Sequence, residues 1–311
     1  TNATNISTNS SAISTINNTT LANFSSGARL YQNQFTYNTG VGQGALAANP
    51  SGAHITALGY NAGNSMTTGD WTIAIGSQAL YSSTDSMNVV AIGYQAGYDM
   101  NTYSSVAIGS KALFSATGDN NVAIGTHAML TNTSGEQNTG IGSYALYSNI
   151  SGNFNTSFGN SSLYANTTGD YNSAFGKNAL DNNTTGSYNI AVGADALAKN
   201  STGNNNTAIG YQAGGTSNDL GGSSGSGNVY LGYKAGYNNT SSNKLYIANG
   251  LQTGDALLYG DFSTGDLDLG QTSGTVTVLN DADIDGTLTL GSMSDVESSI
   301  NTNTTNITSN D

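Results

Sequence analysis

A short apolar step that ends in glycine recurs along most of the chain. Successive glycines of this step lie 16 or 17 residues apart, except that the last two lie 22 residues apart. A fixed period of this length indicates a repeat architecture in which each copy is one structural unit. The twelve copies are Val41-Gly42, Leu58-Gly59, Ile75-Gly76, Ile92-Gly93, Ile108-Gly109, Ile124-Gly125, Ile141-Gly142, Phe158-Gly159, Phe175-Gly176, Val192-Gly193, Ile209-Gly210 and Leu231-Gly232.

Each copy also contains the pattern of a short β-strand. With positions counted from the repeat glycine, −3 and −1 are apolar or β-branched in most copies and −2 is usually alanine, as in Ile73-Ala74-Ile75. This period of two predicts a strand, and Asn-Thr-Thr-Gly stretches such as 166–169 predict turns between strands. No stripe with the 3.6-residue period of a helix persists. We therefore expect an all-β protein, a repetitive β-roll or β-solenoid with one coil per copy.

Small residues at fixed positions predict a narrow interior. Coils about 4.8 Å apart would form a stack roughly 50 Å long over the eleven steps from Gly42 to Gly232. We expect the repeat glycine to occupy a corner with positive φ, or a place where neighbouring backbones leave no room for a Cβ. Alanine at +3, replaced only by Ser162, is expected to point inward. Such a coil encloses three or four apolar residues, which favours burial of a second face against sister chains.

Both ends of the chain carry apolar residues and asparagines at alternating spacings of three and four. The C-terminal positions are Met293, Val296, Ile300, Asn303, Ile307 and Asn310. The N-terminal positions are Asn2, Ile6, Asn9, Ile13 and Ile16. These spacings place the residues on one side of a helix in a heptad register. Short coiled-coil segments are therefore predicted at both ends.

The repeat and the two arms together resemble trimeric fibre proteins. The NxxAIGxxAL form, as at Asn121–Gly125, resembles the head repeats of trimeric autotransporter adhesins. The 17-residue form with Asn-Thr-Thr-Gly turns and the ending Asn243–Asn249 look more like phage tail fibres and related bacterial surface fibres, without a segment that resembles their endosialidase-type chaperone. The resemblance covers about residues 1–20, 38–249 and 293–311. It implies a left-handed parallel β-roll that associates as a homotrimer between trimeric coiled coils.

The same resemblance implies a bound anion in the stalks. Three asparagines at the d position of an Ile-x-x-Asn stalk can form a ring that holds a chloride ion on the trimer axis. By resemblance this role falls on Asn9, Asn303 and Asn310. No other cofactor is expected.

These patterns divide the chain into five segments. Residues 250–291 break the repeat, and the alternating stretches 275–278 and 287–290 within them predict two short strands. The predicted segments are 1–20 (coiled-coil stalk end), 21–37 (N-terminal cap or connector), 38–249 (β-roll of 17-residue repeats), 250–291 (β-prism-like connector) and 292–311 (coiled-coil stalk start).

Charge and cysteine content exclude several classes of protein. The chain has 6 Lys and Arg against 19 Asp and Glu, a formal net charge of −13. Six basic residues cannot supply the phosphate contacts of a nucleic-acid-binding protein, and an acidic chain disfavours an anionic membrane surface. The lack of cysteine removes disulfides, thiolate zinc sites and thiol nucleophiles. No apolar run approaches the about 20 residues of a membrane-spanning helix, so direct membrane insertion is not expected.

The polar composition also bears on location. The chain opens at Thr1 without methionine or a positively charged leader, which indicates a segment processed or excised from a longer protein. Uncharged surfaces rich in Asn, Thr, Ser and Gly favour an extracellular place, in a cell-surface fibre or a virion tail fibre.

No pattern in the chain points to catalysis. The two histidines, His54 and His127, lie at −5 and +2 of their copies, and no acidic residue recurs beside either. We expect both to be surface or edge residues, and we do not expect an enzyme. A glycan-cleaving tail spike would require acidic pairs along a groove, whereas the acidic residues cluster after residue 254.

One acidic stretch resembles half of a calcium-binding loop. Asp281, Asp283 and Asp285 precede Gly286 with the spacing D-x-D-x-D-G. A complete loop needs a bidentate glutamate at its twelfth position, which is Ser292 here. Calcium is therefore a weak candidate, and a strand followed by a turn, with the carboxylates outward, is the alternative.

Aromatic residues are the candidates for ligand binding. Tyrosine follows the repeat glycine at Tyr60, Tyr94, Tyr211 and Tyr233, and the single tryptophan, Trp71, falls at a turn. Exposed aromatic rings on a fibre can stack on sugar rings, because a tyrosine offers an apolar face and a hydroxyl. Alternatively, the same rings pack between adjacent coils.

Together these features predict a structural and adhesive segment of an extracellular homotrimeric fibre. Its partners would be two copies of itself and a cell-surface glycan or receptor, and three identical surfaces would multiply weak contacts. The main alternative is a passive spacer shaft of a phage tail fibre or surface appendage, with the binding tip elsewhere. A glycan-cleaving tail spike ranks below both.

Overall fold

The described part of the molecule is built entirely of strands and turns. The computed structural model describes residues 30–33, 36–48, 50–216, 224–250 and 256–269. By its contacts the chain divides into two units, Thr1–Ser273 and Gly274–Asp311, and the second lies wholly outside the described residues. The described residues contain eighteen strands and no helix, so they hold no helix able to span a membrane.

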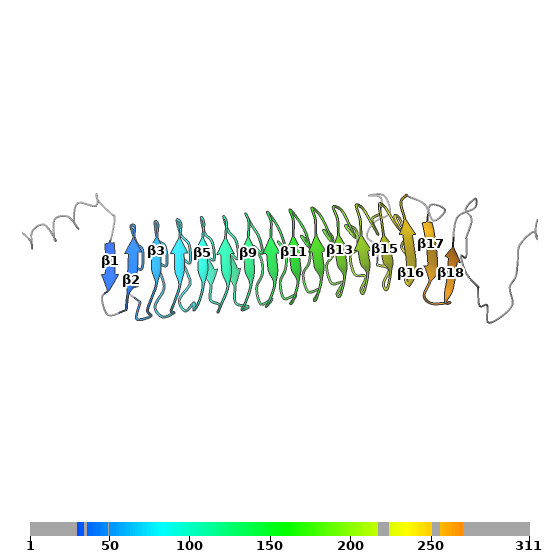
Figure 1. Ribbon diagram of the computed structural model, residues 1–311. Helices are drawn as coiled ribbons and strands as arrows, with labels where there is room; N and C mark the ends of the chain where they lie inside the picture. Colours follow the sequence, from blue (N-terminus) through cyan, green and yellow to red (C-terminus); the bar gives the residue numbers. More distant parts are fainter. Residues whose placement is uncertain (1–29, 34–35, 49, 217–223, 251–255, 270–311) are drawn as a thin grey trace, which may run out of the picture. The chain divides into compact units, whose positions relative to one another are not determined.

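Thirteen strands run parallel, one per coil, and form one side of a solenoid (Figure 1). An antiparallel strand, β1 (Leu30–Asn33), pairs with the first of them, and β17 (Ala256–Asp261) and β18 (Asp266–Leu269) continue the sheet antiparallel beyond the last. A separate pair, β6 (Asp99–Met100) and β8 (Ser115–Ala116), lies elsewhere on the coils. The parallel strands are β2 (Asn38–Val41), β3 (Thr56–Leu58), β4 (Ile73–Ile75), β5 (Val90–Ile92), β7 (Val106–Ile108), β9 (Val122–Ile124), β10 (Thr139–Ile141), β11 (Thr156–Phe158), β12 (Ser173–Phe175), β13 (Ile190–Val192), β14 (Thr207–Ile209), β15 (Val229–Leu231) and β16 (Lys244–Ala248).

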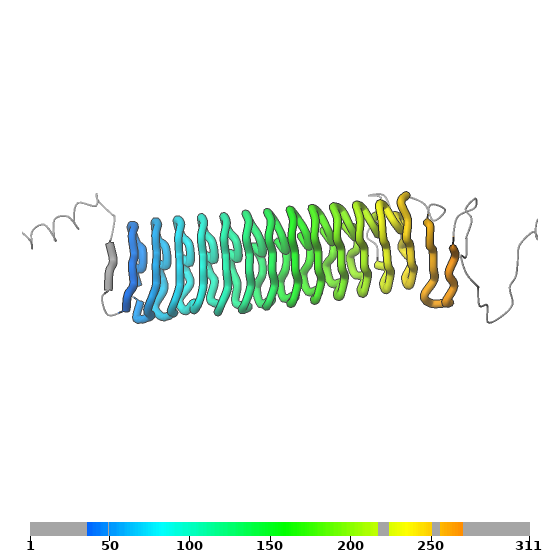
Figure 2. Tube along the Cα trace, viewed as in Figure 1, coloured from blue at the N-terminus to red at the C-terminus, as the bar shows by residue number. Residues whose placement is uncertain are grey.

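The strands pair in a register that aligns equivalent positions of successive coils. Ala107 of β7 pairs with Ala123 of β9, for example, and the same match holds along the parallel sheet. Every repeat position therefore forms a column along the stack, and Figure 2 shows the successive turns of the Cα trace lying one beside the next. The predicted all-β solenoid of about twelve coils is confirmed; the trimer and the coiled-coil ends stay predictions.

The repeat glycine is required for both of the expected reasons. Gly109 has a φ of +129°, in the region that side chains disfavour. A Cβ built on it would also lie 2.5 Å from the carbonyl oxygen of Gly125 in the next coil. The tight column of glycines therefore lets the coils approach each other at this corner.

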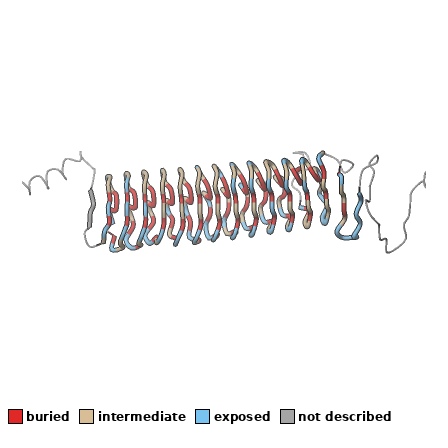
Figure 3. Tube along the Cα trace, viewed as in Figure 1, coloured by how far each residue is buried: buried red, intermediate tan, exposed pale blue. Residues whose placement is uncertain are grey.

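The interior is narrow because two small residues face each other across it. Ala74 at −2 and Ala79 at +3 are fully buried, and Leu80 at +4 is the large side chain of the same coil. Figure 3 shows the resulting pattern, in which short buried segments recur from coil to coil. The one coil with serine at +3, Ser162, also has serine at −2, Ser157, and the two buried hydroxyls hydrogen-bond to each other. A buried polar group thus comes with its partner.

The +4 position is glycine in four coils and leucine or methionine in the other eight, and other side chains fill the core where it is glycine. Leu80 has a φ of +51°, which is unfavourable for leucine, and Gly97 in the next coil avoids this cost. The space that the absent side chain leaves is filled from elsewhere. A Cβ on Gly97 would lie 2.9 Å from Cε of Met100, at +7, and Met66 occupies the same position in the coil of Gly63.

Buried asparagines replace apolar residues in the C-terminal half of the stack. Two columns, at −4 and +7, are joined from coil to coil by side-chain hydrogen bonds; Asn166 Nδ2, for example, donates to Asn149 Oδ1 at 2.8 Å. In the N-terminal half the same columns include Ile55, Val89 and Met100. The asparagine ladders comprise Asn121, Asn138, Asn155, Asn172, Asn189, Asn206 and Asn228 at −4, and Asn132, Asn149, Asn166, Asn183 and Asn200 at +7.

Candidate functional site

The strands turn their large apolar side chains outward. In β4 the central Ala74 is buried, whereas Ile73 before it is 37% exposed. The apolar alternation of each copy therefore marks the outside of the solenoid, and alanine marks the inside. We call the outward residues at −3 and −1 the outer sheet face. Its exposed members are Leu58, Ile73, Phe158, Phe175, Ile190, Val192, Ile209 and Leu231.

A continuous apolar surface of this kind is unusual on a monomer. Soluble monomers rarely expose contiguous apolar patches larger than a few hundred Å², and larger ones mark interaction surfaces. The members of the outer sheet face lie in adjacent coils, because β11 to β15 pair directly with one another. The face is therefore a candidate interface.

The tyrosines at +1 lie on the surface but form only one pair. Tyr60 and Tyr94 are about half exposed and are separated by the coil that carries Ser77 at the same position. The rings of Tyr211 and Tyr233 stack with centroids 5.8 Å apart, and Lys234 Nζ lies 5.3 Å from the Tyr233 ring. The four tyrosines thus do not form one continuous column, and binding by these residues stays a prediction.

Trp71 lies at a corner of the coil, as expected from its turn, and it is 57% exposed with a φ of +50°. Its ring stacks on His54 at 6.0 Å, and His54 stacks on Tyr37 at 5.3 Å. His54 is therefore a surface residue, as predicted. The same corner carries a second stack farther along the solenoid. Its members are Phe154, Tyr171 and Tyr188, with centroids 4.7 and 5.1 Å apart.

Another aromatic column lies at +5, and we call it the aromatic ladder. Tyr81, Tyr98 and Phe114 stack at 5.1 and 4.9 Å. After one interruption, Tyr147 and Tyr164 stack at 4.9 Å. The ladder is broken twice, first by Leu130, then by the three residues Asp181, Ala198 and Gly215, and it ends at Tyr237.

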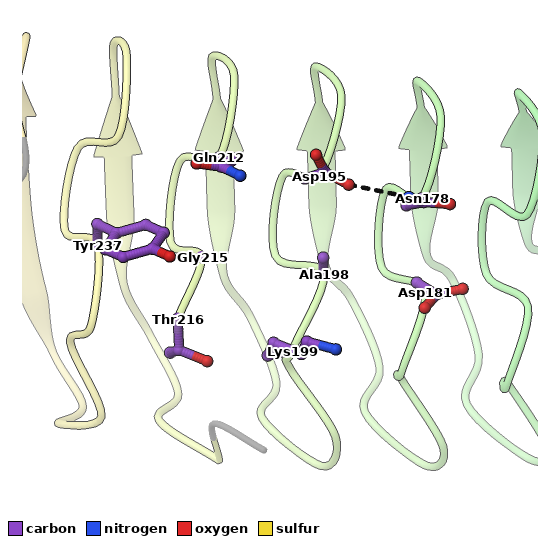
Figure 4. Close-up of a pocket in the computed structure, with 9 residues that line it drawn as sticks. All are labelled: Asn178, Asp181, Asp195, Ala198, Lys199, Gln212, Gly215, Thr216 and Tyr237. Carbon is purple, nitrogen blue, oxygen red and sulfur yellow. Dashed lines mark hydrogen bonds between the residues drawn. The ribbon is translucent and has the colours of Figure 1, made fainter. Parts of the chain in front are cut away.

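The second interruption opens a polar hollow of about 300 Å³ (Figure 4). Asn178 Nδ2 donates to Asp195 Oδ1 at 3.0 Å. Asn182, with its amide oriented to satisfy both neighbours, donates to Asp181 at 3.2 Å and accepts from Lys199 Nζ at 3.1 Å. Both carboxylates are therefore already bonded to neighbouring side chains. The lining residues are Asn178, Asp181, Asp195, Ala198, Lys199, Gln212, Gly215, Thr216 and Tyr237.

Burial shifts the acidity of one carboxylate in this hollow. The pKa of Asp181 is raised above its usual value mainly by desolvation, with a further rise from Asp195, and Lys199 opposes the shift. Carboxylates with a shifted pKa often mark functional sites. Here the hydrogen bonds from Asn178 and Asn182 and the nearby ammonium of Lys199 account for the placement of the two carboxylates.

The first interruption opens a larger and more apolar hollow of about 520 Å³ beside Leu130. Phe114 and Tyr147 lie on its two sides along the stack, and Lys111 Nζ is 5.9 Å from the Phe114 ring. His127 contributes to the wall, and its Nδ1 is buried without a hydrogen-bond partner among the described residues. The lining residues are Lys111, Phe114, Ser115, His127, Leu130, Thr131, Thr133 and Tyr147.

His127, predicted to be a surface or edge residue, contacts other aromatic rings. It is half-buried, and its ring contacts Tyr144 at 5.2 Å in a tilted arrangement and Tyr147 at 6.4 Å edge-on. The imidazole is therefore part of an aromatic cluster on the same side of the coils as the two hollows.

The residues of the predicted ion sites lie outside the described part of the chain. Asn9, Asn303 and Asn310 lie outside the described residues, and so does the acidic stretch from Asp281 to Asp285. Within the described ranges, no group of three or more His, Cys, Asp or Glu side chains is arranged to hold a metal ion.

Both aromatic columns escaped the sequence interpretation, although the repeat contains the signal. Writing every aromatic residue by its offset from the repeat glycine places five rings at +5 between Tyr81 and Tyr164 and five at −5 between Tyr37 and Tyr188. The hollows follow from the non-aromatic residues in the first of these columns.

Comparison with known proteins gave no relative from which to transfer a function: no family model matches the chain, and neither a curated protein nor a solved structure matches it.

Proposed function

We propose that the chain is a segment of an extracellular homotrimeric fibre that attaches to surfaces. The outer sheet face is the observation that supports this most directly. It presents Ile190 and Ile209, each 43% exposed, within one uninterrupted sheet. The partner that fits such a face best is another copy of the chain, because only an equally spaced repeat can match apolar residues coil by coil.

The apolar area at stake is large enough to drive association. Full burial of a Val, Leu, Ile or Phe side chain is worth about 1.5–3 kcal/mol, so burying the remaining two-fifths of one adds about 0.6–1.2 kcal/mol. The eight exposed members of the outer sheet face would together contribute at most about 5–10 kcal/mol per chain. This is comparable to the whole stability of a small domain. Three copies, as opposed to two, is the number that the resemblance to trimeric fibres implies.

An adhesive role is supported by the repeated, weakly charged surface. Each chain carries 8% charged residues and exposes aromatic rings at the corner and, on the ladder, Tyr164. Three identical surfaces on one fibre would raise the avidity of individually weak contacts without any new contact.

A passive spacer is the second candidate function, and one observation favours it. The corner rings, such as Tyr171 and Tyr188, stack on each other at 5.1 Å, so coil-to-coil packing alone accounts for them. A glycan-cleaving enzyme has less support. The acidic pair of the polar hollow, Asp181 and Asp195, is engaged by neighbouring amides.

The solution mass of the purified chain tests the assembly. We expect about three times the 31.6 kDa of one chain. Charges at Ile190→Asp and Ile209→Asp should dissociate the trimer, whereas Thr126→Asp, at an exposed position away from the outer sheet face, should leave it intact. Circular dichroism verifies that each variant keeps its β-structure. A monomeric wild-type protein would contradict the assembly.

Adherence of the assembled protein to cells tests attachment. Binding by the trimer, lost when cell-surface glycans are removed, would support the adhesive function. A trimer that binds no cell type and no immobilised polysaccharide would favour the spacer.

A further inference from the structure

The interruption of the aromatic ladder at Leu130 places a leucine side chain between two aromatic rings. Intact parts of the ladder on either side repeat at 4.9 Å, between Tyr98 and Phe114 and between Tyr147 and Tyr164. Phe114 and Tyr147 themselves are two coils apart, which corresponds to about 9.6 Å at the spacing of paired strands. A ring placed midway would stand about 4.8 Å from each of them. Because the leucine side chain is shorter than the rings that its neighbours carry, an open hollow remains beyond its tip, between those rings.

A sugar ring has the shape and the surface that this space accepts. One face of a pyranose is lined by C–H groups, which pack on aromatic rings, while its edge carries hydroxyls. Phe114 and Tyr147 supply the rings on two sides. The volume of about 520 Å³ lies within the range of small-ligand pockets, about 300–1,000 Å³.

Polar groups of the wall match the edge of such a ring. Lys111 supplies an ammonium donor, and no carboxylate lines this hollow to neutralise it. His127 adds the side of its imidazole to the wall, while its Nδ1 is covered by protein atoms and takes no part in contacting the ligand. The polar hollow beside Ala198 differs from this one, because its carboxylates are already bonded to neighbouring side chains.

We propose that the hollow beside Leu130 binds one pyranose unit of a surface glycan, which completes the aromatic ladder between Phe114 and Tyr147. The inference rests on the proposed adhesive function and gives it a site. Lys111 would donate to a hydroxyl of a neutral sugar and would bind the carboxylate of an acidic one more strongly.

Filling the hollow with a tyrosine, the residue most frequent in the aromatic ladder, tests the site. Leu130→Tyr places a ring where the neighbouring coils already have one, so the fold should tolerate it. Ala198→Tyr is the matched control, because it adds the same ring in the other interruption of the ladder. Binding is measured for the assembled protein against immobilised neutral hexoses, N-acetylhexosamines and hexuronic acids. We expect Leu130→Tyr to weaken the wild-type binding at least tenfold and Ala198→Tyr to change it less than twofold.

A measurement on the wild-type protein removes the dependence on how the variant folds. The methyl resonances of Leu130 should shift when the bound saccharide is added. Unshifted resonances, equal binding by Leu130→Tyr, or a wild-type protein that binds no saccharide would each overturn the site.

The failure of the site and that of the proposed function remain distinguishable. A trimer that adheres to cells with its hollow closed would refute the site and leave the adhesive function standing. A monomer that adheres to nothing would refute both.

Discussion

Replacing Asn172 with alanine tests how strongly the buried asparagine ladder holds the coils together. The side-chain Nδ2 of Asn172 donates to Gly186 O at 2.8 Å, and its Oδ1 accepts from the backbone N–H of Asn189 at 3.0 Å. Gly186 O keeps a second donor in the variant, since Asn183 Nδ2 lies 2.9 Å away. The N–H of Asn189 is left buried with no acceptor.

The expected loss of stability follows from the unpaired N–H of Asn189 and from the hydrogen bonds that the Asn172 side chain no longer makes. A buried donor without a partner costs about 1–3 kcal/mol, and each ordinary hydrogen bond contributes about 0.5–1.5 kcal/mol. We therefore expect Asn172→Ala to destabilise this coil by about 2–3 kcal/mol. At about 1.4 kcal/mol per factor of ten, this corresponds to roughly 30- to 150-fold in the opening equilibrium.

Hydrogen exchange of the Asn189 amide measures the effect directly, because exchange requires the coil to open. The amide should exchange roughly 30- to 150-fold faster in Asn172→Ala than in the wild type. Asn172→Ser is the control. Serine keeps an acceptor, as Ser105 does at the equivalent position, where its Oγ accepts from the Asn121 N–H at 3.2 Å. Wild-type exchange in the alanine variant, or equal losses for serine and alanine, would refute the reasoning.

Three further predictions concern the backbone, the core and pH. Gly159→Ala should abolish cooperative thermal unfolding, because its Cβ would lie 2.5 Å from a backbone oxygen of the next coil. Gly265→Ala meets nothing within 4 Å and carries only the cost of its φ of +81°, so it should lower the midpoint by no more than a few degrees. Gly97→Leu should destabilise the protein in chemical denaturation, and adding Met100→Asn, which recreates the leucine-type coil, should recover most of the loss; additive losses would contradict shared volume. Burial raises the pKa of Tyr230 to about 12 from 10.0, so the folded state holds the phenol proton more tightly than the unfolded state does. The folded state therefore loses stability as the pH rises from about 10 to about 12, by up to about 2.7 kcal/mol. Denaturant unfolding titrations at about pH 10 and about pH 12 should show this loss in the wild type and not in Tyr230→Phe.

The features of the fold that repeat in every copy could be predicted from the sequence. The glycine corner and the inward alanine recur at fixed offsets, so their physical reasons could be stated without coordinates, and Gly109 and Ala79 illustrate both. The direction of the apolar alternation could not. A period of two defines two faces of a strand without stating which is inside. Ile73 lies outside because the strand packs Ala74 at −2 against Ala79 at +3, where a small side chain fits.

The candidate sites depend on contacts between coils, and this is why they were missed. Leu130 is unremarkable within its own copy, and it bounds a hollow only because Phe114 and Tyr147 precede and follow it in one column. Likewise, Met100 fills space left by Gly97. In this case a side chain at +7 compensates for a missing side chain at +4. A consensus sequence of the repeat, which averages each position separately, does not show that the two positions change together.

The locality of the asparagine ladder has a consequence for how the molecule can change over generations. The hydrogen-bond partners of the Asn172 side chain lie 14 or 17 residues away, within one coil of it. Loss of one 17-residue block among the asparagine coils would therefore rejoin equivalent partners and shorten the stack by about 4.8 Å. Misaligned recombination between copies in the gene can thus adjust the reach of the molecule in uniform increments, with no redesign of its interior.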